Sequence, residues 1–105
     1  MEIGLSNSME TILTLIGNKW KILILWDLFE GTKRFSELKK SIGTVSQKAL
    51  TSQLRSMEDA GLVNRTVYAE VPPRVEYALT ERGYSLKPVL DAMWNWSNIS
   101  KIHEG

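Results

Sequence analysis

A helix with a wholly polar outer face, followed by a hairpin with two prolines in its turn, most constrains the fold of this chain. Ser46 is a good helix N-cap, and the residues after it separate into two faces. Apolar side chains at helical spacing form the inward face: Ala49, Leu50, Leu54, Met57 and Leu62. Hydrogen-bonding side chains form the outward face: Gln47, Lys48, Thr51, Ser52 and Arg55. These two faces predict an amphipathic helix at about residues 46–60.

The predicted hairpin spans about residues 62–79. Two runs rich in Val, Thr and Tyr, Leu62 to Ala69 and Arg74 to Leu79, flank the sequence Glu70-Val71-Pro72-Pro73. Because proline cannot donate a hydrogen bond to a strand ladder, the two prolines belong in the connecting loop, where they keep it extended and stiff.

The segments before this helix predict a helix-turn-helix arrangement. Lys19 to Glu30 is apolar nearly all round and suits a central buried helix. Thr32 to Arg34 is expected to be a short extended link, and Phe35 to Ser41 a short helix that stops at Gly43. A short helix, a turn, a second helix and a hairpin make a winged helix-turn-helix. We therefore expect one domain over residues 1–105, mainly α with a small β-hairpin (α+β).

The two ends of the chain are predicted to be apolar helices at about residues 8–16 and 81–102. Asn7 with Glu10 fits a capping box, and Gly17 with Asn18 is expected to end the first helix. Thr80 caps the C-terminal region, in which Pro88 should start or kink a segment. These helices offer more apolar surface than one small domain covers, which predicts a homodimer. The expected interface residues are Met9, Ile12, Leu13, Leu90, Met93 and Trp94.

Basic charge is concentrated in the middle of the chain. Residues 33–55 carry six basic side chains against one acid, for a net charge of +5, whereas residues 1–32 carry −2. This polarity favours a polyanion as partner. A polar helix face taken alone is usually just solvated, but the preceding basic helix, the turn and the hairpin favour contact with double-stranded DNA.

Each candidate DNA contact follows from its expected place. From the Ser46 cap onward, Gln47, Lys48, Thr51 and Ser52 are expected at bases or adjacent phosphates. Arg55 is expected at backbone phosphate, and Arg74 in the minor groove. Lys33 and Arg34 could hold a phosphate at the start of the short helix, whereas Lys39 and Lys40 are expected to be solubilising charges.

Several other functions are disfavoured by composition. The chain has no cysteine, which excludes disulfides, zinc fingers and thiol chemistry. His103 is a lone histidine without a metal-ligand partner, and no Ser, His and acid set suggests catalysis, so neither an enzyme nor a cofactor is expected. The four tryptophans, Trp20, Trp26, Trp94 and Trp96, are expected in core or interface. The longest apolar run, Ile22 to Trp26, is too short to cross a membrane, and without a secretion signal we expect a cytosolic chain.

Several motifs in order resemble the HxlR-type regulators, a branch of the MarR-like winged-helix proteins of bacteria. The matching pieces are Ile16-Gly17-Asn18-Lys19-Trp20, Arg34-Phe35-Ser36-Glu37-Leu38, Ser46-Gln47-Lys48-Ala49-Leu50-Thr51, Leu54-Arg55, Gly61-Leu62-Val63, and Val71-Pro72-Pro73-Arg74-Val75-Glu76-Tyr77 with Leu79-Thr80. The resemblance implies a dimeric transcription regulator with the Ser46 helix in the major groove and the hairpin as wing. Many relatives carry a cysteine just before the first helix, where this chain has Asn7, so thiol sensing is unsupported.

Two functions from different classes remain open. The first is a homodimeric, sequence-specific regulator that binds an inverted-repeat operator and responds to a small molecule, a partner or its own concentration. The alternative is a winged-helix interaction module that uses its basic face for a protein partner. An enzyme is a distant third.

Overall fold

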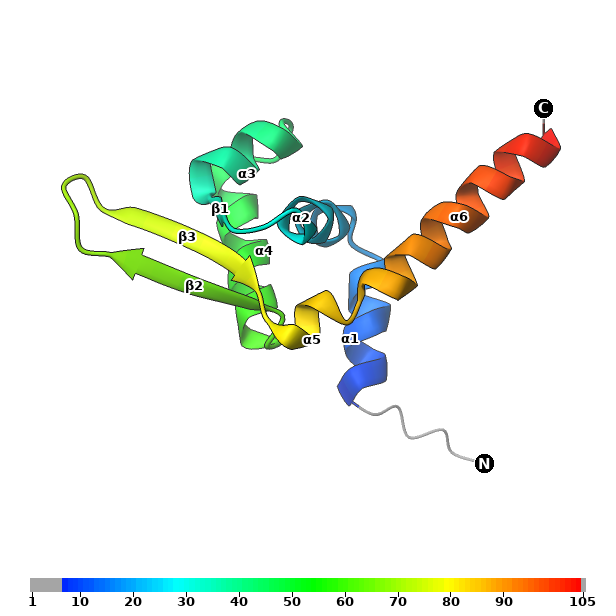
Figure 1. Cartoon of the computed structure of the whole chain (residues 1–105), viewed down its shortest axis with the longest axis horizontal. Coiled ribbons are helices and arrows are strands. Elements are labelled where there is room, and N and C mark those ends of the chain that lie inside the picture. The colour runs from blue at the N-terminus through cyan, green and yellow to red at the C-terminus, as the bar shows by residue number, and fades with distance from the viewer. Residues whose placement is uncertain (1–6, 105) are drawn as a thin grey trace.

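The predicted order of helices and hairpin is present in the computed structural model of the chain (Figure 1), which describes residues 7–104 and the side chains of residues 9–15 and 17–99. The elements in chain order are α1 (Asn7–Ile16), α2 (Lys19–Phe29), β1 (Lys33–Arg34), α3 (Phe35–Ile42), α4 (Gln47–Asp59), β2 (Val63–Tyr68), β3 (Arg74–Leu79), α5 (Glu81–Tyr84) and α6 (Lys87–Glu104). The expected fold class, mainly α with a small antiparallel sheet, is confirmed.

Helix α2 forms the centre of the hydrophobic core. Its side chains Ile24, Leu25 and Leu28 are fully buried, and they belong to one cluster with buried residues of α3, α4 and the hairpin. As predicted, α1 ends at Ile16 and is followed by Gly17 and Asn18, but Asn18 has a second role that the sequence analysis did not assign to it. Asn18 is the N-cap of α2, because its Oδ1 accepts a hydrogen bond from the Lys21 amide at 3.2 Å. The end of α1 and the start of α2 are thus separated by Gly17 and this cap.

The sheet has three strands in the order β1-β3-β2 within the described residues. The hairpin strands pair antiparallel from Val63 opposite Leu79 to Tyr68 opposite Arg74. The interpretation of residues 32–34 as a plain link is corrected, because Lys33 and Arg34 pair with the other edge of β3. An exposed edge of β3 would leave backbone donors and acceptors unpaired, and this short strand covers part of it.

Local features of the chain fix the turn between α3 and α4. Gly43 ends α3 with φ at 83°, a conformation that costs glycine little. Val45 in the turn is buried, and the Ser46 hydroxyl accepts a hydrogen bond from the Ala49 amide at 3.0 Å. The inward residues predicted for α4 are buried, with Ala49 half-buried, and the five predicted outward residues are all exposed. The two faces of α4 are therefore as the sequence predicted.

The C-terminal helical region, expected at about 81–102 with a start or kink at Pro88, forms two helices. Thr80 caps the short helix α5 by accepting a hydrogen bond from the Gly83 amide at 3.0 Å. The chain breaks at Ser85 and Leu86, and α6 then begins with Pro88 in its first turn, where proline is tolerated. Figure 1 shows α6 projecting away from the rest of the molecule.

Both terminal helices expose apolar side chains. Met9 and Leu13 of α1 and Met93, Trp94 and Trp96 of α6 are all exposed, Trp96 by 70%. Leu90, predicted at a dimer interface, instead belongs to the core at 5% exposure, and Ile12 is half-buried. The radius of gyration is 15.6 Å, whereas a compact chain of this length has about 13 Å.

Three predictions concern side chains outside the described residues: the Asn7 cap, the apolar Ile16 and the lone His103. In the part of the chain that is described, no helix combines the length and apolar character needed to cross a membrane.

Candidate nucleic-acid interface

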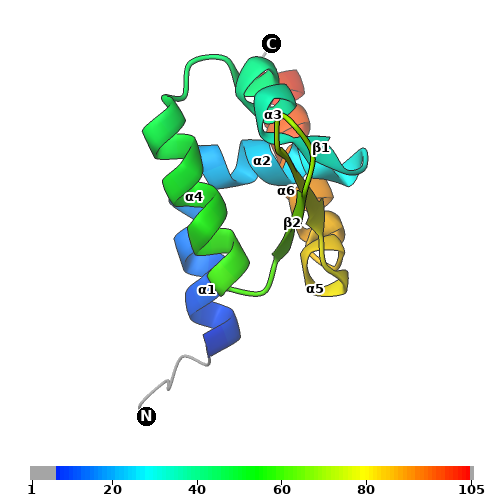
Figure 2. The same cartoon turned by 90° about the vertical axis from the view of Figure 1, so that its left-hand side faces the viewer.

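An open groove runs between α4 and the hairpin. Figure 2 shows α4 and β2 side by side, with α3 across one end. The groove has a volume of about 360 Å³ and mixes charged, polar and aromatic side chains. Its lining residues are Phe35, Gln47, Thr51, Arg55, Glu58, Arg65, Val75 and Tyr77. Three residues predicted from the sequence to contact DNA, Gln47, Thr51 and Arg55, therefore share one surface with the hairpin.

The outer face of α4 carries cations that no described acidic side chain neutralises. Lys48 and Arg55 are exposed, and neither forms an ion pair with another described side chain. The Thr51 hydroxyl donates to the Gln47 carbonyl oxygen at 2.9 Å, so its oxygen remains free to accept a hydrogen bond. The exposed Ser52 adds a second hydroxyl beside it. This face offers both charge for phosphates and hydrogen-bonding groups for base edges.

The first turn of α4 meets the basic end of α3. A second surface groove, of about 490 Å³, contains Gln47 together with Lys39, Lys40 and Gly43. The sequence interpretation treated the two lysines as solubilising charges only. Because they lie around the turn that precedes α4, they add positive charge next to Gln47.

Arg65 is a candidate that the sequence analysis missed. It lies exposed on β2 opposite Tyr77, lines the groove with Arg55, and has no ion pair among the described side chains. Strand alternation in the sequence could have identified Arg65, because it lies two residues beyond the buried Val63 and therefore on the same face of the hairpin. Glu58 lines the same groove and partly offsets the charge of the two arginines.

Arg74 is less free than the sequence suggested. It is the first residue of β3 rather than part of the loop tip. Its Nη2 lies 3.2 Å from Glu70 Oε1, and its Nε lies 3.4 Å from Glu76 Oε2. Its guanidinium also covers the ring of Tyr68. Arg74 thus joins the loop to both strands, and any phosphate contact by it would compete with two carboxylates.

Lys33 and Arg34 lie at the start of α3 as predicted, in different electrostatic settings. The Lys33 ammonium forms an ion pair with Glu30 at 3.3 Å. The Arg34 amide donates a hydrogen bond to Glu37 Oε1 at 2.8 Å, so this amide is already used within the chain. The Arg34 side chain is exposed and makes no ion pair with the described residues. It lines a surface groove of about 400 Å³ with the hairpin loop. Arg34 is therefore the cation of this pair that is available to a ligand.

No group of His, Cys, Asp and Glu side chains suited to hold a metal ion occurs among the described residues. The surface described above is open, basic and rich in hydrogen-bonding groups, and it extends from α3 over α4 to the hairpin. Those properties suit a large polyanion rather than an enclosed small molecule.

Comparison with known proteins identifies related sequences and folds. Residues 15–103 match the family described as HxlR-like helix-turn-helix. An HTH-type transcriptional regulator of Methanothermobacter thermautotrophicus is 48% identical over 97 residues, which cover 92% of this chain and 74% of the relative.

Solved structures have the same fold. The HTH-type transcriptional regulator YtcD superposes with a TM-score of 0.82 at 46% identity, covering 90% of this chain and 97% of that one. The redox regulator HypR in its reduced form gives 0.81 at 40% identity, covering 94% of this chain and 100% of that one.

Proposed function

We propose that this chain, which belongs to the HxlR-like helix-turn-helix family of non-enzymatic transcriptional regulators, is a homodimeric repressor or activator of specific genes. It binds an inverted-repeat operator in double-stranded DNA, with α4 in the major groove and the hairpin near the minor groove. The observation that carries the proposal is the groove in which Gln47, Thr51 and Arg55 of α4 meet Arg65 of the hairpin.

The division of labour follows from what each side chain can do. Gln47 and Thr51 read base edges, because an amide both donates and accepts and the Thr51 oxygen accepts. Lys48, Arg55 and Arg65 hold phosphates, since they are exposed and lack ion pairs with the described side chains. Ser46 caps α4, and with Ser52 it completes the polar face at the DNA.

Arg34 and the hairpin extend the interface along the DNA backbone. The Arg34 side chain is exposed beside the loop of residues 69–73, so both can approach the same strand of the duplex. Arg74 keeps the loop next to its strands through Glu70 and Glu76, and near the minor groove it exchanges one carboxylate for phosphate.

The dimer is formed by α1 and α6. Met9, Leu13, Met93, Trp94 and Trp96 are exposed apolar side chains on these two helices, and α6 projects from the body of the subunit (Figure 1). A second copy would cover both helices and remove these side chains from water. Two copies related by a twofold axis would present their α4 helices to successive major-groove faces, about 34 Å apart.

The signal that controls binding is one that does not use a thiol, because the chain has no cysteine. The candidate signals that remain are a small molecule, a protein partner and the cellular concentration of the dimer. A chromosomal target would place the protein in the cytoplasm.

The proposal is tested by selecting random duplex DNA against the purified protein at physiological salt. We expect enrichment of one inverted repeat, and weaker binding of that repeat by the variants Arg55→Ala and Arg65→Ala. Lys19→Ala is the matched control, since Lys19 is an exposed cation on α2 outside the groove.

Absence of any enriched sequence, together with equal DNA binding by all variants, would contradict operator recognition. That result would instead favour a protein partner on the basic face.

A further inference from the structure

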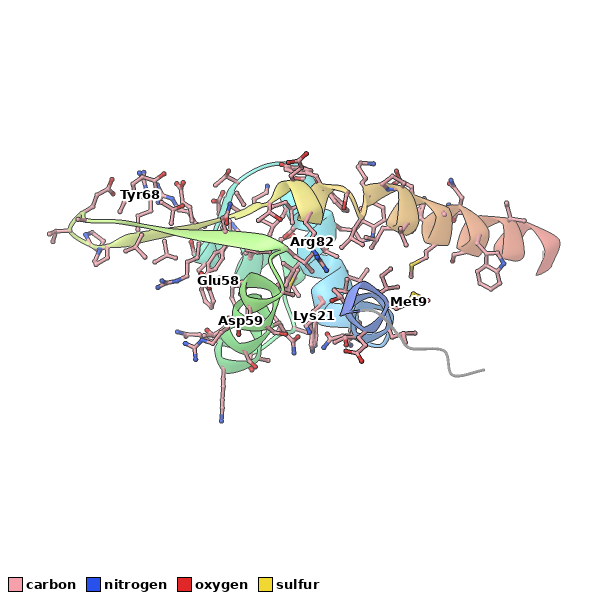
Figure 3. All side chains as sticks on the ribbon, turned by 90° about the horizontal axis from the view of Figure 1, so that it is seen from below. Met9, Lys21, Glu58, Asp59, Tyr68 and Arg82 are labelled. Atoms are coloured by element: carbon pink, nitrogen blue, oxygen red, sulfur yellow. The ribbon has the colours of Figure 1, made fainter. Side chains whose placement is uncertain are left out.

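Two side-chain hydrogen bonds join the start of α2 to the side of α4 that faces away from the groove at the hairpin. Asn18 Nδ2 donates to Gln53 Oε1 at 3.1 Å, and Lys21 Nζ donates to Ser56 Oγ at 2.9 Å. Figure 3 shows Lys21 between α4 and α1, whereas Glu58, which lines the groove, lies on the hairpin side of α4. At about 3.6 residues per turn, Gln53 and Ser56 point roughly opposite to Glu58. The two bonds therefore hold α4 from behind.

The bonded residues have the same spacing on both helices. Asn18 and Lys21 are three residues apart, and so are Gln53 and Ser56. Residues with this spacing lie on one side of a helix and about one turn apart. One bond alone would act as a pivot. Two bonds one turn apart fix both the rotation of α4 about its own axis and its position along α2.

Asn18 is held in the orientation that its bond to α4 requires. Its Oδ1 accepts a hydrogen bond from the Lys21 amide as the N-cap of α2, which leaves Nδ2 as the donor to Gln53. Both side chains of this bond are half-buried. The cap of α2 and the contact with α4 thus depend on one amide group, and neither can change without the other.

Lys21 contributes direction rather than stability. Among the described residues it is the charged side chain that is buried, at 8% exposure. An ammonium that exchanges water for a neutral hydroxyl loses hydration without gaining a counter-charge, so an apolar side chain of similar size is expected to be at least as stable there. Stability therefore does not account for Lys21, whereas a directional bond that fixes helix register does.

The apolar contacts of α4 define its rotation less sharply than base recognition requires. Leu50, Leu54 and Met57 are fully buried, and hydrophobic attraction has no preferred direction. A hydrogen bond to a base edge needs a distance of about 2.7–3.2 Å, so a shift of about 1 Å breaks it. The attraction between a cation and a phosphate declines gradually with distance and tolerates such a shift.

We propose that Asn18 and Lys21 are positioning residues for base recognition. Through Gln53 and Ser56 they set the rotation of α4, and with it the places of the base-reading side chains. This inference rests on the proposed function. Loss of either bond impairs the distinction between the operator and an altered operator more than it impairs attachment to DNA of any sequence.

Asn18→Ser and Lys21→Met remove the two bonds separately. Serine keeps the N-cap of α2 but is too short to reach Gln53, and methionine keeps the volume of Lys21 without a donor. Both variants should lower, by about tenfold, the ratio of the affinity for the operator to the affinity for an operator with one altered base pair. Affinity for an unrelated duplex should fall by less than about twofold, with an unchanged salt slope, because the phosphate contacts remain.

Lys19→Met is the matched control. Lys19 is an exposed cation in the same turn of α2, and its ammonium lies 4.5 Å from the centroid of the Trp20 ring. This variant should leave the affinity ratio unchanged. Urea unfolding should show that Lys21→Met is at least as stable as the native protein. A merely structural role of Lys21 would instead lower the stability and leave the ratio as it is.

Ser56→Ala tests whether Lys21 acts through its bond to α4. It removes the acceptor of this bond and should lower the affinity ratio as Lys21→Met does. The protein with both substitutions should be no worse than either single variant, because the two changes remove the same interaction. Additive losses of the ratio would show that Lys21 does not act through Ser56, and would overturn its role.

Residual dipolar couplings of the backbone amides, measured without DNA, report the rotation of α4 relative to α2. The protein that carries both Asn18→Ser and Lys21→Met should show α4 turned. An affinity ratio unchanged in both single variants, an equal loss for all DNA sequences, or an unturned α4 would overturn the inference. Failure of the native protein to select any DNA would contradict the proposed function, and the dipolar couplings would still decide whether the two bonds orient α4.

Discussion

Arg74 covers the ring of Tyr68 across the last pair of the hairpin, with its Cζ 4.2 Å from the ring centroid. The same guanidinium pairs with Glu70 in the loop and Glu76 on β3. A side chain that makes a cation–π contact and two ion pairs holds the loop against both strands. Arg74 therefore has a structural role in the hairpin that is separate from any contact with DNA.

Arg74→Ala is expected to weaken binding to many DNA sequences alike. If Arg74 contacts phosphate, the slope of log affinity against log salt should also fall in magnitude by about 1. If it only positions the loop, the affinity should fall without a change in slope. Fluorescence anisotropy over a salt series measures both quantities. Unaltered affinity at every salt concentration would show that Arg74 neither contacts DNA nor positions the hairpin loop for DNA binding.

Gln47→Ala is expected to relax base preference at one operator position by about 1–3 kcal/mol. Gln47 lies in the first turn of α4, where two grooves meet, and its amide can both donate and accept. Lys48→Ala is the comparison, because loss of a phosphate contact should weaken all sequences to a similar degree. Competition binding against operators with single base changes measures the preference. An identical preference profile in Gln47→Ala would remove this residue from base recognition.

Part of this interface could be predicted because its signals are local. The Ser46 cap, the apolar spacing and Gly61 define α4 to within one residue of the predicted 46–60. The pairing of Lys33 with Tyr77 could not be predicted in the same way, since it joins segments far apart in the chain. Glycine followed by asparagine both ends a helix and caps the next one, so the role of Asn18 was ambiguous.

Burial and charge partners at other positions depended on how the elements pack. The start of α6 lies against the core, which buries Leu90 and leaves Trp94 of the next turn exposed at 58%. Arg65 became a candidate only once β2 was placed beside α4. The Glu70 and Glu76 partners of Arg74 follow from strand alternation and loop shape together.

Trp94→Asp is expected to convert the proposed dimer to monomer. A carboxylate placed in an apolar interface loses its hydration without gaining a partner, and this cost opposes association. Val71→Asp is a suitable control, because Val71 is a fully exposed apolar residue in the hairpin loop, remote from α1 and α6. Sedimentation equilibrium gives the mass of each variant. A Trp94→Asp protein that remains dimeric would place the interface elsewhere.

Gly83→Ala is expected to destabilise the fold by about 1–3 kcal/mol through overpacking. Gly83 is buried in α5, and a Cβ at this position would collide with the Leu62 carbonyl oxygen and crowd the Leu79 side chain. The colliding atom belongs to the backbone. The same Leu62 carbonyl oxygen accepts a hydrogen bond from the Thr80 amide, so it cannot move aside without breaking that bond. The strain therefore falls on the junction between the hairpin and the C-terminal helices.

The matched variant is Gly17→Ala, where the nearest atom to the added Cβ is the Leu13 carbonyl oxygen at 3.7 Å, an ordinary contact. Urea unfolding at one fixed protein concentration measures both, because the stability of a dimer depends on concentration. The loss should be confined to Gly83→Ala. Equal stability of the two variants would mean that α5 shifts freely on Leu62, and that the start of α6 is not fixed to the hairpin through this contact.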